Sequence, residues 1–215
     1  MKLRFLLAMQ RELDCLRGAG LSGPGRDVSF ALTGIGKVNA ASATARVILE
    51  EKPDIVVNTG VAGGMLPYME PLDLVIADRV AYHDVWCGEG NEPGQVQGLP
   101  RFFPSDPGLV KLAQKASSSC GRNAFTGLVC SGDQFFVSLE EDARIRAMYP
   151  EVLACDMESA AVAQVCHNFG VPFLCLRTIS DVHTSEQVQR SQYSDIMERL
   201  SASDFEFVHA FAELI

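Results

Sequence analysis

Short apolar runs alternate along the chain with longer segments in which apolar residues recur every three or four positions. The runs DIVVNTG and FLCLRT are continuously apolar, which is typical of strands buried on both faces. In Lys37–Glu51 apolar residues repeat at helical spacing, and Pro53 lies just beyond that segment. The pattern predicts strands over Leu3–Ala8, Val28–Thr33, Asp54–Thr59, Leu72–Ala77, Val80–His83, Ala124–Ser131, Val152–Asp156 and Pro172–Thr178, and helices over Lys37–Glu51, Pro107–Ser119, Leu139–Met148, Glu158–Phe169 and Gln192–Leu214.

This alternation predicts an α/β fold with a mixed, mostly parallel central sheet flanked by helices. The 215 residues contain no repeat and no linker, so we expect one domain over residues 1–215. The segment Cys87–Pro107 has the densest glycine and proline content and is predicted to be one long loop. A loop of that length in a compact domain is usually functional, as a lid or an interface segment.

Composition narrows the possible partners and the compartment. The net charge of −9 argues against nucleic-acid binding, which needs a basic face. The seven cysteines are odd in number and form no CxxC pair, so a disulfide framework is not expected. The sequence has no apolar run near the ~20 residues of a membrane span. We therefore expect a cytoplasmic protein that binds neither nucleic acid nor membrane.

In an open α/β sheet, ligands bind beyond the carboxyl ends of the strands. Polar residues and glycines gather at those positions here, and they include carboxylates, an arginine and an aromatic side chain. In chain order the positions are Met9 and Glu12, Gly34–Gly36, Gly60–Gly64, Ser131–Phe135, Asp156–Ser159 and Arg177–Asp181.

Each of these positions also has a purely structural interpretation. Gly34-x-Gly36 is an incomplete dinucleotide fingerprint, and it could simply form a turn before a helix. Glu12 and Asp156 could be first-turn helix acids that the helix dipole favours. Arg177 ends an apolar strand, and a buried guanidinium needs an anionic partner. The pairs His83-Asp84 and Cys166-His167 lack a third ligand at convincing spacing, so no metal site is predicted.

Three segments in combination carry a family resemblance: LTGIGKVNAASATARVILEEKPDIVVNTGVAGG, GLVCSGDQF and DMESAAVAQVCHNFGVPFLCLRTISD. They resemble the purine nucleoside phosphorylase and nucleosidase superfamily. Within it they look closest to the 5′-methylthioadenosine/S-adenosylhomocysteine nucleosidases, and with AMQREL and the terminal helix the resemblance covers most of the chain. It implies hydrolysis of the N-glycosidic bond of an adenine nucleoside, without a cofactor.

The resemblance also implies roles for individual residues. Asp181, oriented by Ser180, would protonate the purine at N7, because an N-glycosidic bond breaks easily only if the base is protonated as it leaves. Glu12 would take a proton from the attacking water, which Glu158 and Arg177 help to position, and Glu158 would hold the ribose hydroxyls. The remaining substrate contacts that the resemblance implies are Phe135 and the backbone around Phe136 at the base, Met9, Met157, Val61 and Gly63 at the sugar, and Ile35 and Tyr193 at the 5′-substituent.

The sequence departs from the family pattern at a few positions. The family's nucleosidases usually have serine in the turn NTGSAGG, and Val61 occupies that place here. The replacement removes a hydroxyl donor near the ribose. Asp156 stands where glutamate is common, and the segment before LTGIGK is shorter than usual. These changes bear on the choice of substrate more than on the reaction class.

Several rival functions remain open at this point. Phosphorolysis is the nearest, but it needs several positive charges or donors around the phosphate. Futalosine-type nucleosides are alternative substrates for a hydrolase. A dinucleotide-dependent oxidoreductase and a nucleoside-sensing module without catalysis are further alternatives. The oxidoreductase would need an acidic residue at the end of the next strand, which this sequence lacks. A sensing module would have no use for the retained carboxylates.

Family members usually form homodimers in which a loop of one subunit completes the 5′ pocket of the other. By resemblance that loop is Cys87–Pro107, with Phe102 or Phe103 as the wall residue. The alternative is a loop whose two aromatic side chains pack within their own subunit.

Overall fold

The structure is a computed structural model that describes residues 1–16, 21–23, 25–135, 138–182, 186–199 and 203–215. Its strands are β1 (Lys2–Leu7), β2 (Asp27–Leu32), β3 (Ile55–Gly64), β4 (Leu74–Tyr82), β5 (Phe103–Pro104), β6 (Ala124–Ser131), β7 (Val152–Asp156) and β8 (Phe173–Val182). Its helices are α1 (Gln10–Leu16), α2 (Lys37–Glu51), α3 (Pro107–Ser119), α4 (Leu139–Met148), α5 (Ser159–Phe169), α6 (Glu186–Arg199) and α7 (Ser203–Leu214).

Five strands close into a ring. β3 pairs with β8, β8 with β4, β4 with β6, β6 with β7, and β7 returns to the end of β3. β1 and β2 extend the sheet from the other edge of β3, in parallel. The β3–β7, β4–β8 and β4–β5 pairs are antiparallel. The predicted mixed sheet is confirmed, although the closure makes it less uniformly parallel than expected.

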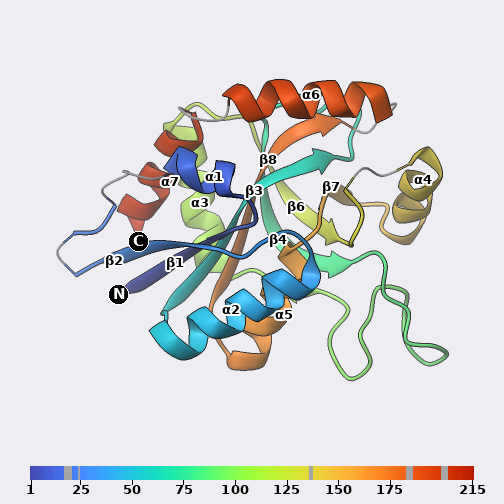
Figure 1. Ribbon diagram of the computed structural model, residues 1–215, viewed down its shortest axis with the longest axis horizontal. Coiled ribbons are helices and arrows are strands. Elements are labelled where there is room, and N and C mark those ends of the chain that lie inside the picture. Colours follow the sequence, from blue (N-terminus) through green and yellow to red (C-terminus); the bar gives the residue numbers. More distant parts are fainter. Residues whose placement is uncertain (17–20, 24, 136–137, 183–185, 200–202) are drawn as a thin grey trace.

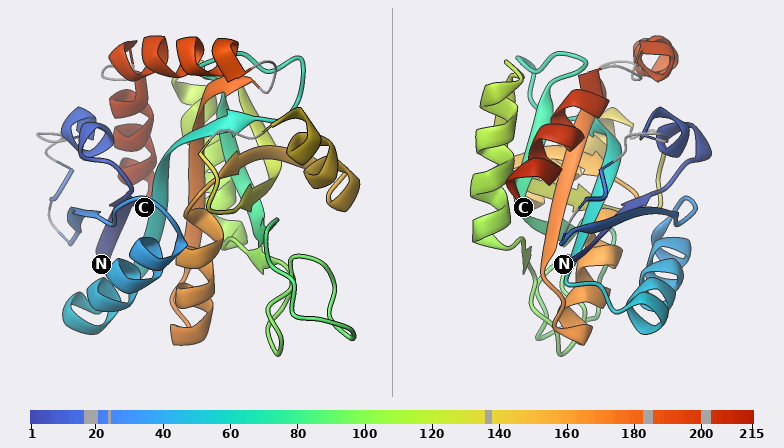
Figure 2. Two further views of the ribbon diagram at one scale, coloured as in Figure 1. Left: turned by 45° about the vertical axis from the view of Figure 1, so that its right-hand side comes forward. Right: turned by 90° about the vertical axis from the view of Figure 1, so that its left-hand side faces the viewer.

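Helices cover both faces of this sheet (Figures 1 and 2). α2 and α5 pack together on one face, and α3 and α7 lie on the opposite face. Each pair covers its own core of buried aliphatic and aromatic side chains. α6 runs across the carboxyl end of β8, at the top of Figure 1. The predicted α/β domain with flanking helices is therefore confirmed.

Several element boundaries differ from the predicted ones. The two predicted strands between Leu72 and His83 form one strand, β4, whose pairing with β6 shifts register between Ala77 and Arg79. β3 continues to Gly64 and β8 to Val182, because the two strands keep pairing past a bulge. The single predicted helix Gln192–Leu214 is replaced by α6 and α7. α1 was not predicted, since seven residues are too few to show helical periodicity.

The predicted long loop projects from the end of β4 toward α3 as the green segment at the lower right of Figure 1, and it contains the short strand β5. Its anchor is Tyr149, whose hydroxyl donates to the Tyr82 carbonyl at 2.9 Å. Gly94, at φ +84°, lies directly against this hydrogen bond. None of the helices in the described part of the chain is long and apolar enough to cross a bilayer.

We predict that Gly94→Ala destabilises the protein much more than Gly98→Ala does. Both glycines have a positive φ, +84° and +80°, so both variants carry the left-handed strain of about 1–2 kcal/mol. Only at position 94 would the new methyl overlap the Tyr149 hydroxyl and the Tyr82 carbonyl. Relieving that overlap should cost about 1–3 kcal/mol more, measured as the free energy of unfolding in urea. Equal losses in the two variants would show that the loop is not anchored in this way.

Candidate active site

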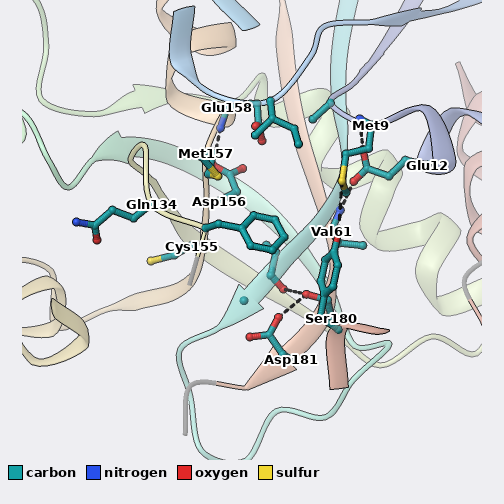
Figure 3. A pocket seen from close by; sticks show the side chains of 16 residues that line it. Met9, Glu12, Val61, Gln134, Cys155, Asp156, Met157, Glu158, Ser180 and Asp181 are labelled. Carbon is teal, nitrogen blue, oxygen red and sulfur yellow. Dashed lines mark hydrogen bonds between the residues drawn. The ribbon is translucent and has the colours of Figure 1, made fainter. Parts of the chain in front are cut away.

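A pocket opens where the carboxyl ends of β1, β6, β7 and β8 meet the last residues of β3 (Figure 3). It holds about 600 Å³ of space free of atoms and is open to solvent on one side. The lining residues are Ala8, Met9, Glu12, Ile35, Val61, Ala62, Gly63, Gln134, Phe135, Cys155, Asp156, Met157, Glu158, Ser180, Asp181 and Tyr193.

Glu12 projects from α1 and is fixed by backbone donors. Its Oε2 accepts from the Met9 amide and its Oε1 from the Val61 amide, each at 2.9 Å. Burial raises the pKa of Glu12, although the Val61 amide and the Arg177 charge oppose the shift. A carboxylate with a raised pKa is a stronger base than an exposed one, and general bases work best when their pKa lies near the operating pH.

Gly60 makes room for this carboxylate. A Cβ at Gly60 would lie 2.5 Å from Glu12 Oε1 and 3.0 Å from Arg177 Nη1. The glycines of β3 therefore form no tight turn. They continue the strand and let a carboxylate approach its backbone closely.

Ser180 and Asp181 form a second polar group at another wall of the pocket (Figure 3). The Ser180 hydroxyl donates to Asp181 Oδ1 at 2.6 Å, and the carbonyl of Ala62 lies 3.3 Å from the same hydroxyl. Both residues are buried and belong to β8 itself. The orientation of Asp181 is thus set by a neighbour held in the sheet.

Glu158 lies just before α5 and reaches toward the start of α2. Its Oε1 accepts from the Gly36 amide at 2.8 Å. Burial, together with the negative charge of Asp156, raises the pKa of Glu158 to about 7. The side chain therefore titrates near neutral pH and can either donate or accept a hydrogen bond there.

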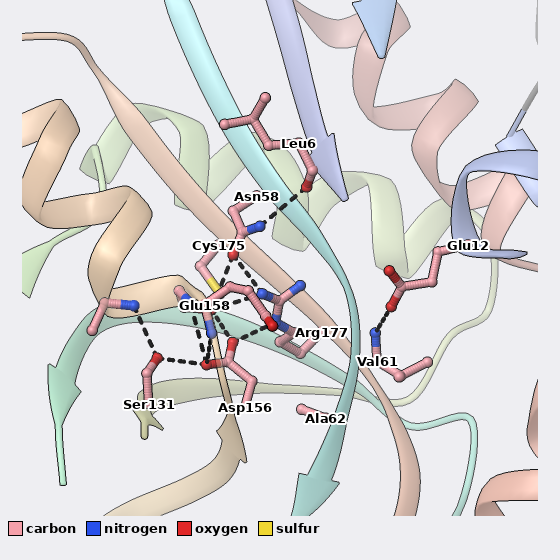
Figure 4. Close-up of polar contacts among 12 residues, drawn as sticks. Leu6, Glu12, Asn58, Val61, Ala62, Ser131, Asp156, Glu158, Cys175 and Arg177 are labelled. Atoms are coloured by element: carbon pink, nitrogen blue, oxygen red, sulfur yellow. Dashed lines mark hydrogen bonds and ion pairs between the residues drawn. The ribbon is translucent and has the colours of Figure 1, made fainter. Parts of the chain in front are cut away.

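Asp156 and Arg177 form an ion pair in the interior (Figure 4), in which Arg177 Nε lies 2.7 Å from Asp156 Oδ2. Each of the two side chains is 2% exposed. Ser131 donates to the same carboxylate, and so do Ser159 and the amides of Glu158 and Ser159. Burial would raise the pKa of Asp156, but the Arg177 charge and these hydrogen bonds lower it below its ordinary value. Asp156 therefore stays ionised, and Arg177 has the anionic partner that its buried position requires.

Aromatic and apolar side chains complete the pocket. The rings of Phe135 and Tyr193 meet edge to face with centroids 5.2 Å apart. The Tyr193 hydroxyl lies 3.3 Å from the sulfur of Met9. Because Tyr193 comes from α6 and Phe135 from the segment after β6, this contact joins two sides of the pocket across its opening.

Most of the residues predicted for the site come together in this one pocket. Lining it are Met9, Glu12, Ile35, Val61, Gly63, Phe135, Met157, Glu158, Ser180, Asp181 and Tyr193. Phe136 lies outside the described residues. Arg177 does not line the pocket, because its guanidinium turns into the interior to pair with Asp156 and to donate to Asn58. Its predicted contact with the attacking water stays a prediction, since Arg177 Nη1 and Glu12 Oε1 both lie against Gly60.

Phe102 and Phe103, predicted as wall residues of a partner's pocket, both make contacts within their own subunit, and their role toward a partner stays a prediction. Phe103 is 1% exposed and packs edge to face on Tyr82 and His167. Phe102 lies against Tyr149 and between the guanidinium groups of Arg79 and Arg101. Both rings therefore pack within their own subunit, which is the alternative stated for them.

Some lining residues were not predicted. Ala8 and Cys155 were not singled out at all, whereas Ala62, Gln134 and Asp156 belong to the segments singled out at the strand ends but were given no contact with the substrate. Asn58 also escaped attention, although it accepts from Arg177 and donates to the Leu6 carbonyl. Within the described part of the chain, no three His, Cys, Asp or Glu side chains are grouped as a metal site would require.

We predict that the contribution of Glu158 to the stability of the ligand-free protein falls as the pH rises from about 5 to about 8, and that Glu158→Gln removes this contribution. The folded state holds the Glu158 proton up to a pKa of about 7, whereas the ordinary value is 4.5. Unfolding in that interval releases a proton, so raising the pH favours unfolding. The glutamine variant should gain on the order of 2 kcal/mol relative to wild type across this range, measured by urea unfolding at each pH. Parallel curves for the two proteins would contradict the shift.

The chain is also similar to known proteins. The pattern that describes the Phosphorylase superfamily matches residues 20–213. A 5′-methylthioadenosine/S-adenosylhomocysteine nucleosidase of Actinobacillus succinogenes is 44% identical over 163 residues, which are 75% of this chain and 71% of that protein.

Solved structures extend the likeness over the whole chain. The nucleosidase of Neisseria meningitidis, in complex with methylthio-immucillin-A, has a TM-score of 0.91 and 35% identity, covering 100% of this chain and 99% of its own. That of Colwellia psychrerythraea, in complex with adenine, has a TM-score of 0.88 and 33% identity, covering 99% and 95%. The chain therefore belongs to the 5′-methylthioadenosine/S-adenosylhomocysteine nucleosidase family of the phosphorylase superfamily.

Proposed function

We propose that the protein hydrolyses the N-glycosidic bond of 5′-methylthioadenosine and S-adenosylhomocysteine, releasing adenine and the thioribose sugar. The observation that carries this proposal is the presence of two differently held carboxyl groups in one pocket. Asp181 is oriented by a serine hydroxyl, and Glu12 is buried and held by two backbone amides. Together they supply a general acid for the departing adenine and a general base for the attacking water.

The reaction then divides between the two groups. Asp181 donates a proton to the purine as the bond to C1′ lengthens, and the base departs as a neutral molecule. Positive charge develops on the sugar, and the negative groups around the pocket stabilise it. Glu12 accepts a proton from the water whose oxygen bonds to C1′. Glu158 holds the ribose hydroxyls, and Phe135 packs on the base.

Charge favours water over phosphate as the acceptor. Among the described residues, none of those lining the pocket has a cationic side chain, whereas Glu12, Asp156, Glu158 and Asp181 are acidic. The arginine nearest to the pocket, Arg177, is already neutralised by Asp156. A phosphate dianion would lack the converging donors that it needs. Val61 adds none, because its side chain is aliphatic.

The test is to incubate the pure protein with 5′-methylthioadenosine, S-adenosylhomocysteine and aminodeoxyfutalosine, each with and without phosphate. Chromatography then identifies the base and the sugar. We expect adenine and a free thioribose from the first two nucleosides, at rates that phosphate does not change. A ribose 1-phosphate product would establish a phosphorylase, and cleavage of aminodeoxyfutalosine alone would identify a futalosine-type hydrolase. Binding without cleavage would identify a nucleoside sensor.

We predict that Asp181→Asn lowers kcat for 5′-methylthioadenosine by at least about 100-fold while an uncleavable analogue binds with nearly unchanged affinity. The amide keeps the size of the carboxyl group but cannot donate the proton that the base requires, and general acid catalysis contributes about 10²–10⁴-fold. Steady-state kinetics and calorimetry with the analogue measure the two effects. A rate close to wild type would refute the role of Asp181.

We also propose that a second copy of the chain covers the pocket mouth. Ile35, Val38 and Trp86 are 45%, 79% and 61% exposed, although each is large and apolar. Lys37 Nζ lies 2.6 Å from Asp84 Oδ2, so the start of α2 and the segment with Trp86 are tied together. A contiguous exposed apolar patch beside a binding site is typical of an interface.

We predict that Val38→Asp converts a dimeric wild type to monomers in sedimentation experiments, because the variant buries a charge in that interface. Leu49→Asp is the control: Leu49 is 62% exposed and lies near the other end of α2. A monomeric wild type would overturn the assignment.

We also propose a cytoplasmic location for the protein. It is supported by the seven cysteines, all of which are free thiols.

A further inference from the structure

The start of α2 is capped by side chains from other elements. Its own N-cap residue is Gly36, which has no side chain, and its first turn is not acidic. The first amides of a helix need acceptors, and carboxylates are favoured there. Glu158, just before α5, accepts from the Gly36 amide at 2.8 Å. Asp133, just after β6, accepts from the Lys37 amide at 2.9 Å through its Oδ1, so two strand ends meet at this helix terminus.

Asp133 is held in place by more than this one hydrogen bond. Its own amide donates to Asp84 Oδ2 at 2.9 Å. Lys37 Nζ lies 2.6 Å from the same Asp84 oxygen and 3.7 Å from Asp133 Oδ2. The backbone and the side chain of Asp133 are therefore both tied to residues outside the Gly132–Phe135 segment.

Two glycines allow these close approaches. A Cβ at Gly36 would lie 3.1 Å from Asp133 Oδ1. A Cβ at Gly132 would lie 2.3 Å from His83 Cε1, so the imidazole packs directly against the backbone of the segment. His83 is 1% exposed, and its amide donates to the Ser131 carbonyl at 3.0 Å. The Gly132–Phe135 segment is thus fixed by a buried ring as well as by the start of α2.

The network around Asp133 connects two parts of the pocket wall. Gln134 and Phe135 line the pocket directly after Asp133 in the chain. Ile35 and Glu158 line it at the start of α2. Asp133 does not line the pocket, and it lies between these two groups of lining residues as their polar connection.

We propose that Asp133 is a positioning residue for nucleoside binding, which fixes Phe135 relative to Glu158 through its hydrogen bond to the Lys37 amide. The inference rests on the proposed function, in which Phe135 packs on the base and Glu158 holds the ribose hydroxyls. Contacts of this kind serve the nucleoside before and during cleavage, so weakening them raises KM and leaves kcat unchanged. Glu12 and Asp181 are held by other residues, so the chemical step should keep its rate.

The test compares Asp133→Ala with Asp133→Asn. The alanine variant should raise KM for 5′-methylthioadenosine by about 5- to 10-fold, the size expected for the loss of one helix cap. The affinity for an uncleavable analogue should fall by the same factor, and kcat should stay within about threefold. Asparagine keeps an oxygen that can accept from the Lys37 amide, and it caps helices about as well as aspartate, so this variant should stay within about twofold of wild type.

Asp106→Ala is the matched control. Asp106 is the N-cap of α3 and accepts from the Gly108 and Leu109 amides at 2.8 and 3.0 Å, but it has no part in the pocket wall. Its loss should lower the melting temperature about as much as the loss of Asp133 and leave KM unchanged.

The outcomes separate this role from the proposed function. If the wild type releases no adenine, the proposed function fails. If the wild type is active, the positioning role alone is overturned when folded Asp133→Ala keeps the wild-type KM or loses activity through kcat only. It is also overturned when Asp133→Asn loses as much affinity as Asp133→Ala, or when Asp106→Ala raises KM equally. Melting temperatures confirm that each variant is folded.

Discussion

The buried ion pair between Asp156 and Arg177 is the interaction on which the site depends. It brings together β7 and β8, two strands of the ring that do not pair with each other, and β3 and β6 contribute Asn58 and Ser131 to the same group (Figure 4). Removing one partner of such a pair leaves an uncompensated buried charge, which costs about 3–5 kcal/mol. The extensive hydrogen bonding of Asp156 offsets part of the cost of burying both ions.

This pair also determines the electrostatics of the pocket. Asp156 remains charged beside Arg177, and its charge helps to raise the pKa of Glu158. Arg177 in turn moderates the raised pKa of Glu12. A single cation held outside the pocket wall therefore tunes carboxyl groups that line it. The resulting negative pocket suits a reaction whose sugar becomes cationic, and it does not suit an anionic second substrate.

The apolar strands and their ends predicted the α/β architecture, and the family resemblance added substrate contacts such as Ile35 and Tyr193, which line the pocket. Neither predicted that Ser180 and Asp181 still lie within β8. That extension depends on pairing with β3 past a bulge, which is a long-range contact without a local signal. That Asp156 is the anionic partner of Arg177, and that Phe103 is buried, was not predicted for the same reason, since each is decided by residues far away in the chain. α1 is too short for its periodicity to be recognised.

The claim at the centre of this account is that Glu12 activates the attacking water. Chemical rescue of Glu12→Ala tests it most directly. We expect this variant to release adenine from 5′-methylthioadenosine at least about 100-fold more slowly than wild type. Added azide needs no general base, and its single negative charge replaces that of the removed carboxylate, so it should restore the rate and yield the 1-azido sugar. A Glu12→Ala variant that hydrolyses the nucleoside at the wild-type rate without azide would contradict the account.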